Sequence, residues 1–305
     1  MSIAYDYAPE TAAAAFLVKP QGLLIDGRRV ASASGRMFNS LNPATEEIIA
    51  TIAEGNEADV DRAVASARRA FEGPWRTMRA SERGQILQRW AELLKRHADE
   101  IVELESLDAG KPIAAVLRQD FPAAIDTLTY YAGWADKISG DVVPVRDDAL
   151  TYTVREPVGV VAAIVPWNFP LMIGMWKLAP ALACGCTVVM KPAELTSLSA
   201  LRIGELAIEA GLPPGVFNIV TGPGRVVGEA LVNHPDVDKV TFTGSPGVGR
   251  GIMKGAAGNF KRVSLELGGK SANVIFDDAD LEAASKAAAA GIFFNAGQVC
   301  SAGSR

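Results

Sequence analysis

Residues 158–166, VGVVAAIVP, begin the pattern that decides the fold of this chain. The run is short, apolar and uncharged, and it is the first of six such runs. A helix-like segment follows each of the first four. Such runs are typical of strands buried on both faces, and their alternation with helices predicts an α/β fold with a doubly wound parallel sheet. The further runs are CTVVMKP (186–192), VFNIVTG (216–222), KVTFTGS (239–245), RVSLELGG (262–269) and ANVIFDD (272–278).

The first half of the chain has a different pattern. Residues 22–53 are predicted to form short strands joined by polar turns. Apolar residues recur at helical spacing in 56–71, behind a possible N-cap at Asn56, and again in 81–107. Residues 139–156 alternate apolar and polar positions around a charged turn, which predicts a hairpin arm.

Composition excludes several classes of function. The chain has 30 basic and 35 acidic residues among 305, so it has no field that would gather nucleic acid or an anionic membrane. No apolar run approaches the roughly 18 residues of a membrane span. The first eighteen residues contain Asp6 and Glu10 but no Lys or Arg, unlike a secretory or transit signal. Three cysteines form no disulfide framework, and a reducing, cytoplasmic setting is expected.

The two histidines, His97 and His234, limit the possible chemistry further. Both are predicted to be solvated helix ends, and neither sits in a Gly-rich or turn context that resembles a catalytic site, which argues against a Ser-His-Asp hydrolase or a Cys-His protease. Cys184 and Cys186 of ACGC lack a second pair of ligands, so no metal site is expected. Any cysteine chemistry must be activated by something other than histidine.

Ligands bind outside the carboxyl ends of the strands in open α/β sheets, so the residues after each strand are the candidate site. The first strand is followed by PWNFP (166–170), where Asn168 could donate to a developing negative charge or simply form a turn. The second ends in KPAE. Lys191 and Glu194 could contact a ribose, or form a solvated loop, and the carboxylate would repel a 2′-phosphate, which favours NAD over NADP.

The later strands end in glycine-rich turns. In FTGSPGVGRG, Gly244 and Gly249 flank a turn into a helix, where backbone N–H groups could approach a pyrophosphate, but the spacing is neither G-x-G-x-x-G nor a P-loop. In LELGGK, Glu266 in mostly apolar surroundings could be a general base, or a surface residue. The turn GQVC places Cys300 after a helix-like segment, with Gly297 freeing the backbone. Its thiolate would be a nucleophile, although many single cysteines are buried and inert.

Together these motifs resemble the aldehyde dehydrogenase superfamily, in order, from about residue 22 to the end. The similarity rests on PWNFP, KPAE, FTGS with its G-x-x-x-x-G, LELGGK and GQVC, of which the last two match the family's active-site signatures. The segment TYYAGWADKISG (129–140) further resembles the branch that acts on retinal, phenylacetaldehyde, betaine aldehyde and other small non-phosphorylated aldehydes.

The resemblance implies a mechanism. The Cys300 thiolate would attack the aldehyde, and the oxyanion of the thiohemiacetal would be held by the Asn168 amide and the backbone N–H of Cys300. Hydride transfer to NAD would leave a thioester, which Glu266 would help to hydrolyse by activating water. Lys177 in MWKLAP matches a lysine that supports the family's active site.

The resemblance also implies the domains and the cofactor contacts. It divides the chain into N-terminal strands and helices of the cofactor-binding domain (1–138), an oligomerisation arm (139–156), a Rossmann-like NAD-binding core (157–268) and the start of the catalytic domain (269–305). The arm implies a homodimer or homotetramer. The implied cofactor contacts are Val165, Pro166, Trp167, Lys191, Glu194, Gly224, Gly228, Phe242, Gly244, Ser245, Val248, Gly249 and Leu267.

Members of this family continue well beyond the nucleophilic cysteine. The sequence therefore predicts that this form is a fragment of an NAD-dependent aldehyde dehydrogenase, with most of the catalytic domain absent and little activity of its own. An alternative from a different class is a nucleotide-binding or decoy module that docks on full-length subunits through the arm.

Overall fold

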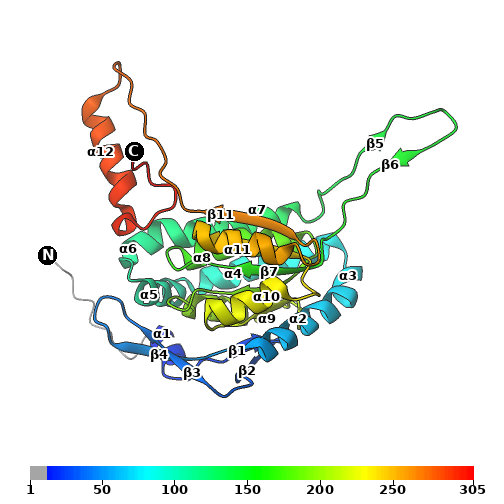
Figure 1. Cartoon of the computed structure of the whole chain (residues 1–305), viewed down its shortest axis with the longest axis horizontal. Helices are drawn as coiled ribbons and strands as arrows, with labels where there is room; N and C mark the ends of the chain where they lie inside the picture. Colours follow the sequence, from blue (N-terminus) through cyan, green and yellow to red (C-terminus); the bar gives the residue numbers. More distant parts are fainter. Residues whose placement is uncertain (1–11) are drawn as a thin grey trace.

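The structure is a computed structural model, and it describes residues 12–305 (Figure 1). The expectation drawn from Asp6 and Glu10 at the start of the chain concerns residues outside this range. Within residues 12–305, no helix combines the length and apolar character that crossing a membrane would need.

A mixed sheet of seven strands organises residues 12–305, in the order β11-β10-β7-β8-β9-β1-β2. The five strands from β11 to β9 are parallel, and the hairpin β1-β2 pairs antiparallel with β9 at one edge. This confirms the predicted doubly wound parallel sheet. The strands are β1 (Leu23–Ile25), β2 (Arg28–Val30), β7 (Val160–Ile164), β8 (Thr187–Lys191), β9 (Phe217–Ile219), β10 (Lys239–Gly244) and β11 (Arg262–Leu267).

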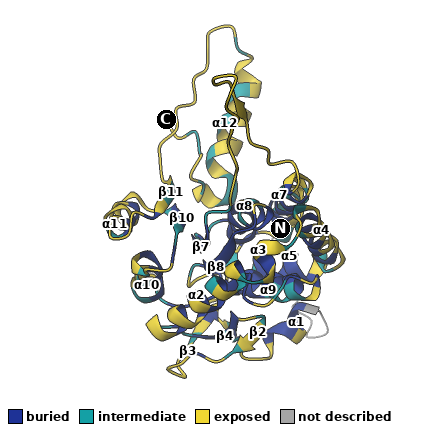
Figure 2. Cartoon of the chain, turned by 90° about the vertical axis from the view of Figure 1, so that its right-hand side faces the viewer, coloured by how far each residue is buried: buried dark blue, intermediate teal, exposed yellow. Residues whose placement is uncertain are grey.

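Alternate residues of the central strands point into two different cores. In β7, Val161 and Ala163 belong to one hydrophobic cluster, whereas Val160 and Ala162 belong to the other. Successive side chains of a strand point to opposite faces, so a strand with both faces covered is apolar throughout. Figure 2 shows the buried residues concentrated around this sheet. One face is covered by α4 (Ala80–Arg96), α5 (Ala98–Ala109), α7 (Phe121–Trp134), α8 (Pro170–Ala183) and α9 (Leu198–Glu209), and the other by α2 (Glu57–Glu72), α10 (Glu229–Asn233) and α11 (Pro246–Ala256).

The strand order reverses between β7 and β10. The chain runs from β7 outward through β8 and β9, and then returns to the other side of β7 to form β10 and β11. The loops after β7 and β10 therefore diverge and leave a crevice, which is where open α/β sheets bind their ligands.

The helices of the N-terminal half follow the sequence pattern with one difference. Asn56 caps α2 in a capping box with Asp59, as predicted. The segment 81–107, however, forms two helices, α4 and α5, which meet at His97. The ψ of His97 is 23°, outside the helical range, so the chain changes direction there without a Pro or Gly to signal it. The remaining elements of this half are α1 (Ala12–Leu17), β3 (Met37–Leu41), β4 (Ile48–Ala53), α3 (Pro74–Thr77), α6 (Ile113–Ala115) and the π-helix η1 (Val116–Asp120).

The predicted hairpin arm is confirmed and extends away from the body of the molecule (Figure 1). Its strands are β5 (Val142–Val143) and β6 (Thr151–Tyr152), and the apolar side chains of Leu150 and Val154 are largely exposed. A two-stranded hairpin that packs on nothing is marginal in water.

The C-terminal segment also lies apart from the body and is mostly exposed (Figure 2). The helix predicted around 281–294 is confirmed as α12 (Leu281–Phe293), followed by a 3₁₀ turn, η3 (Phe294–Gly297). The strand predicted for residues 272–278 is wrong. Asn273 bonds only with Arg305 across the backbone, and one residue cannot form a ladder. Strand β11 lies at the edge of the sheet, and each of its residues is exposed or only partly buried, so the prediction of burial on both faces is wrong for it.

Candidate active site

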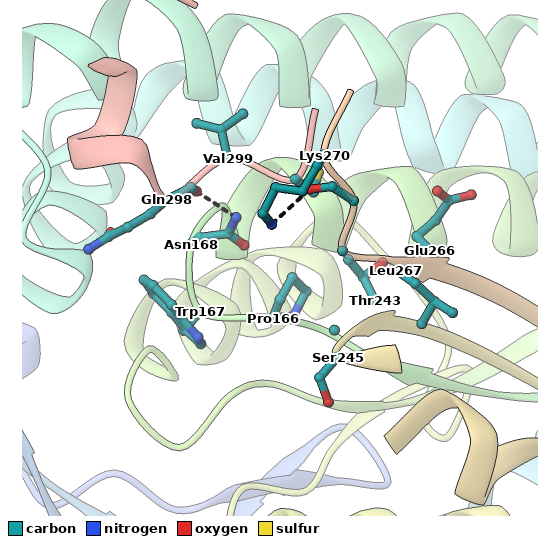
Figure 3. Close-up of a pocket in the computed structure, with 14 residues that line it drawn as sticks. Pro166, Trp167, Asn168, Thr243, Ser245, Glu266, Leu267, Lys270, Gln298 and Val299 are labelled. Carbon is teal, nitrogen blue, oxygen red and sulfur yellow. Dashed lines mark hydrogen bonds between the residues drawn. The ribbon is translucent and has the colours of Figure 1, made fainter. Parts of the chain in front are cut away.

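A pocket of about 280 Å³ opens at the crevice between β7 and β10 (Figure 3). Four segments line it, and each is one that the sequence motifs marked: 166–168 after β7, 243–245 at the end of β10, 266–270 at the end of β11, and 298–300 after η3. Three of the four predicted catalytic residues, Asn168, Glu266 and Cys300, are therefore at one site although 132 positions separate the first from the last.

Asn168 connects the loop after β7 to the turn that carries the cysteine. Its Nδ2 donates to the backbone carbonyl of Gln298 at 2.8 Å (Figure 3). Its own backbone carbonyl accepts from Nδ2 of Asn295 at 3.2 Å. An amide nitrogen carries two hydrogens, so one remains for a second acceptor. Asn168 thus both holds the turn and has a donor to spare beside Cys300.

The turn before Cys300 is conformationally demanding. Asn295, Ala296 and Gly297 all have positive φ, at 49°, 54° and 79°. Asparagine and glycine tolerate this region, but a Cβ-bearing residue such as Ala296 adopts it only when its surroundings hold it there. The side chain of Cys300 is exposed, so the alternative of a buried, inert cysteine is wrong.

Glu266 and Lys177 lie on neighbouring elements with very different exposure. Glu266 is exposed, and its carboxylate points away from Asn168 in Figure 3, so the predicted apolar surroundings are wrong: β11 is the edge strand. Lys177 of α8 is buried and donates to Oγ1 of Thr241 at 3.1 Å. Burial lowers the pKa of Lys177 to about 8, while the carboxylate of Glu266 opposes that shift. Lys177 does not line the pocket.

The predicted ribose contacts form a second cluster beyond β8. Lys191 is buried, and its Nζ lies 4.0 Å from Oε1 of Glu194, which also accepts the backbone N–H of Gly224 at 2.7 Å. Burial lowers the pKa of Lys191 and Glu194 opposes this. A Cβ at Gly224 would lie 3.9 Å from both charged groups. Lys191 and Glu194 of KPAE therefore form a charged cluster beside Gly224 of the segment after β9. The solvated-loop alternative is wrong for Lys191, which is buried.

The N-terminus of α11 faces the crevice. Ser245 is the N-cap and accepts from the N–H of Val248, whose side chain is exposed. A Cβ at Gly249 would come within 2.8 Å of Cδ2 of Leu267, so glycine here allows the helix to lie close to β11. Pro246 has no N–H, and the N–H groups of Val248 and Gly249 bond to Ser245, so what this eleven-residue helix offers an anion is mainly its positive dipole end.

The other predicted cofactor contacts are distributed around these two clusters. Pro166 is partly exposed and Trp167 more so, and both line the pocket, as does Gly244. Val165 and Phe242 are buried behind it, and a Cβ at Gly244 would lie 2.4 Å from the ring of Phe242. Gly228 ends the π-helix η2 (Gly224–Gly228), and it does not line the pocket.

Sequence reasoning missed several residues of the site. Thr243 lines the pocket, and its Oγ1 is buried with no hydrogen-bond partner in the described part of the chain. Its position at the last but one residue of a central parallel strand could have marked it. Gln298 contributes only a backbone carbonyl, and Lys270 lies in an exposed loop, so neither gives a side-chain signal in the sequence.

The two histidines are at helix ends, as predicted, but neither is simply solvated. His97 accepts or donates through Nδ1 to Glu100 at 2.9 Å, and His234 lies 3.3 Å from Asp61. Neither lines the pocket. Cys300 therefore has no histidine partner there. Among residues 12–305, no group of three or more His, Cys, Asp or Glu side chains could hold a metal ion.

The structure thus places a cysteine, an amide and a carboxylate around the switch point of a doubly wound sheet, and comparison with known proteins identifies the family. The model of the aldehyde dehydrogenase family matches residues 30–305, and the chain belongs to this family. Aldehyde dehydrogenase 1A1 of Gallus gallus is 54% identical over 278 residues, which are 90% of this chain and 54% of that protein. Retinal dehydrogenase 2 of Gallus gallus is 52% identical over 291 residues, 94% of this chain and 56% of that protein.

Solved structures show the same similarity. The NAD⁺ complex of an aldehyde dehydrogenase from Bacillus cereus superposes with a TM-score of 0.94 at 50% identity, over 95% of this chain and 60% of that one. The chain thus spans less than two thirds of the length of the relatives it matches.

Proposed function

We propose that these residues form the NAD-binding part and the nucleophile of an enzyme that oxidises an aldehyde to a carboxylic acid. The observation that supports this most strongly is the meeting of Cys300, Asn168 and Glu266 around one pocket at the switch point of the sheet. A thiol nucleophile, an amide donor and a carboxylate are the three groups that such an oxidation requires.

The residues present fit NAD. The N-terminus of α11 with Ser245 would hold the pyrophosphate, and Gly249 keeps the helix close enough to β11 for a ligand to lie between the loops. Lys191 and Glu194 would contact the adenosine ribose, and the missing side chain at Gly224 keeps both charged groups accessible to it. The carboxylate of Glu194 would repel the 2′-phosphate of NADP. When bound, NAD supplies the acceptor for the hydride that leaves the substrate carbon.

In the first step, Sγ of Cys300 as a thiolate forms a bond to the carbonyl carbon of the aldehyde, and the carbonyl oxygen becomes an oxyanion. The free hydrogen of Asn168 Nδ2 and the backbone N–H of Cys300 would donate to this oxygen. Because Asn168 is already fixed by Gln298 and Asn295, little reorganisation is needed as the charge develops. Loss of hydride from the same carbon leaves a thioester on Cys300.

In the second step, Glu266 would accept a proton from a water that attacks the thioester, which releases the carboxylic acid and the Cys300 thiolate. The side chain of Glu266 is exposed and turned away from Asn168, so it must rotate about its own χ angles to reach this position. Lys177, buried beneath β10 and within electrostatic reach of Glu266, would bias where that carboxylate rests.

The substrate class proposed is small, non-phosphorylated aldehydes, on the strength of TYYAGWADKISG and of the similarity to Retinal dehydrogenase 2. The exposed arm of residues 139–156 would pair with another subunit and give a homodimer or homotetramer, and the enzyme would be cytoplasmic. Its apolar side chains, among them Leu150 and Val154, would be covered by that pairing.

The test is NADH formation by the protein encoded by the whole reading frame that contains these residues, as wild type and as Cys300→Ala. The proposal predicts NADH formation from NAD and a short aldehyde, and its loss in Cys300→Ala. Binding of NAD without turnover by the wild type would refute it. That result, with co-purification of a full-length partner that is lost on deletion of 141–155, would favour the docking module instead.

A further inference from the structure

A buried ion pair lies behind the candidate active site, outside every motif described above. Nζ of Lys111, which follows α5, donates to Oδ2 of Asp120, the last residue of the π-helix η1. Lys111 is 3% exposed and Asp120 is fully buried. The other carboxylate oxygen of Asp120 has no hydrogen-bond partner in residues 12–305. A buried pair with an unsatisfied oxygen is a poor way to stabilise a fold, because an apolar pair of similar volume would cost less desolvation.

The position of Lys111 indicates what the pair is for. Its Nζ lies 3.6 Å from the centroid of the Phe169 ring. Phe169 is itself buried, so the cation and the ring meet away from water, where a cation–π contact is strongest. The ammonium group thus has two partners, the carboxylate of Asp120 and the face of Phe169.

Phe169 connects this pair to the reacting groups. It directly follows Asn168 in the chain, and its ring stacks on that of Phe294, with 6.2 Å between the centroids and 21° between the planes. Phe294 begins η3, the turn that leads to Cys300, and Asn168 holds the same turn through Gln298. A side chain that fixes Phe169 therefore acts on both walls of the site.

A second carboxylate holds the other side of the same segment. Oε1 of Glu105 accepts the N–H of Leu171 in the first turn of α8, at 3.0 Å, and Oε2 accepts from Oγ of Ser199 at 2.5 Å. Glu105 is fully buried and interacts electrostatically with Lys111. Residues 168–171 are thus held from both sides by charged groups of α5 and the segment after it.

The local backbone is unusual where Asp120 is placed. Val116–Asp120 form a π-helix between α6 and α7. Such turns are rare, and they are frequently found at functional sites. Here the wider turn ends at Asp120, the partner of Lys111.

We propose that Lys111 is a positioning residue, whose ammonium group holds the ring of Phe169 and thereby fixes Asn168 and the turn 294–300 in the geometry that catalysis needs. Lys111 touches neither substrate nor cofactor in this account. The effect on catalysis rests on the proposed function, but the positioning of Phe169, Asn168 and the turn 294–300 can be tested without turnover.

The test separates loss of the cation from loss of the fold. Lys111→Met alone leaves Asp120 buried and unpaired, so the informative variant is Lys111→Met with Asp120→Leu, which removes both charges together. Lys111→Arg restores a cation that can lie over an aromatic ring. The matched control is Lys261→Met, because Lys261 is equally buried but donates to backbone carbonyls of Val232 and His234, away from Phe169.

The measurement is amide hydrogen exchange by mass spectrometry on peptides that cover 166–171 and 294–300. We expect exchange in both peptides to become about fivefold faster or more in the double variant, to return towards the wild-type rate in Lys111→Arg, and to stay unchanged in Lys261→Met. In the protein from the whole reading frame, kcat falls in the double variant while KM for NAD is unchanged.

Unchanged exchange in both peptides of a folded double variant would overturn the proposal, as would a Lys111→Arg variant that behaves like the double variant. If the wild type gives no NADH, the proposed function fails, but the exchange result still decides whether Lys111 holds the turn.

Discussion

Replacing Glu105 with Gln is expected to remove a pH dependence of stability from this protein. Glu105 is fully buried in α5, and its two oxygens accept from Leu171 and Ser199. Burial raises the pKa of Glu105 to about 7, and the hydrogen bonds from Ser199 and Leu171 oppose that shift only in part. Glutamine has nearly the same shape, keeps one acceptor for the N–H of Leu171, and carries no charge at any pH.

The sign follows from proton binding. Because the folded-state pKa of Glu105 lies above its usual value of 4.5, the native state binds the proton more tightly than the unfolded state. Glu105 therefore makes its full contribution to the free energy of unfolding below about pH 4.5, and this contribution is lost as the pH rises through about 7. A shift of this size corresponds to about 3 kcal/mol. Burial also raises the pKa of Asp108 to about 7, so Asp108 likewise lowers the free energy of unfolding as the pH rises.

The assay is urea unfolding followed by tryptophan fluorescence at several values of pH between 4 and 8. As the pH rises from 4 to 8, the free energy of unfolding of Glu105→Gln is expected to increase by about 3 kcal/mol relative to that of the wild type. Glu92→Gln, at an exposed position of α4, is the control and should follow the wild type. If the free energies of unfolding of Glu105→Gln and the wild type changed with pH in parallel, the loss of stability could not come from ionisation of Glu105.

Three further outcomes follow from single contacts. Gly249→Ala would place a Cβ 2.8 Å from Cδ2 of Leu267, an exposed side chain that lines the pocket and must then move, so we expect NAD affinity to fall about tenfold or more by calorimetry, with little change in melting temperature. Trp90→Phe loses the bond from Nε1 to the carbonyl of Ile203 at 3.0 Å and leaves a cavity, which should lower the free energy of unfolding by about 2 kcal/mol in urea titrations. Because burial lowers the pKa of Lys177, the wild type should gain about 3 kcal/mol in the free energy of unfolding as the pH rises from about 8 towards 10.5. Lys177→Met should abolish this gain, and a gain that persists in the variant would belong to another group.

The sequence predicted those parts of the fold that a local period determines. The strands were found because side chains that alternate between two buried faces leave an unbroken apolar run, as in β7 and β8. The failed strand at 272–278 has the same composition, but a strand exists only with a partner, and composition does not supply one. The periodicity of 81–107 predicted one continuous helix, because no Pro or Gly marks the break at His97, although the sequence around this histidine indicated a helix end.

Residues of the candidate site were predicted where a motif follows a strand. The buried charged residues that hold the segment 168–171 from behind were missed. PWNFP, FTGS, LELGGK and GQVC were found because the fold brings strand ends together. Glu105 lies in α5, Asp120 ends the π-helix η1 and Lys111 lies in the loop between α5 and α6, where charged residues look in the sequence like an ordinary solvated surface. Only the packing shows that these charges are buried and directed at Phe169 and the first turn of α8.

The most direct test of the whole account is calorimetric titration of this chain with NAD and with NADP, as wild type and as Glu194→Gln. We expect the wild type to bind NAD, and to bind NADP at least about tenfold more weakly. Glu194→Gln should narrow this difference in affinity, because the carboxylate that accepts from Gly224 would no longer repel a 2′-phosphate. A wild type that binds neither nucleotide, or that prefers NADP, would contradict it.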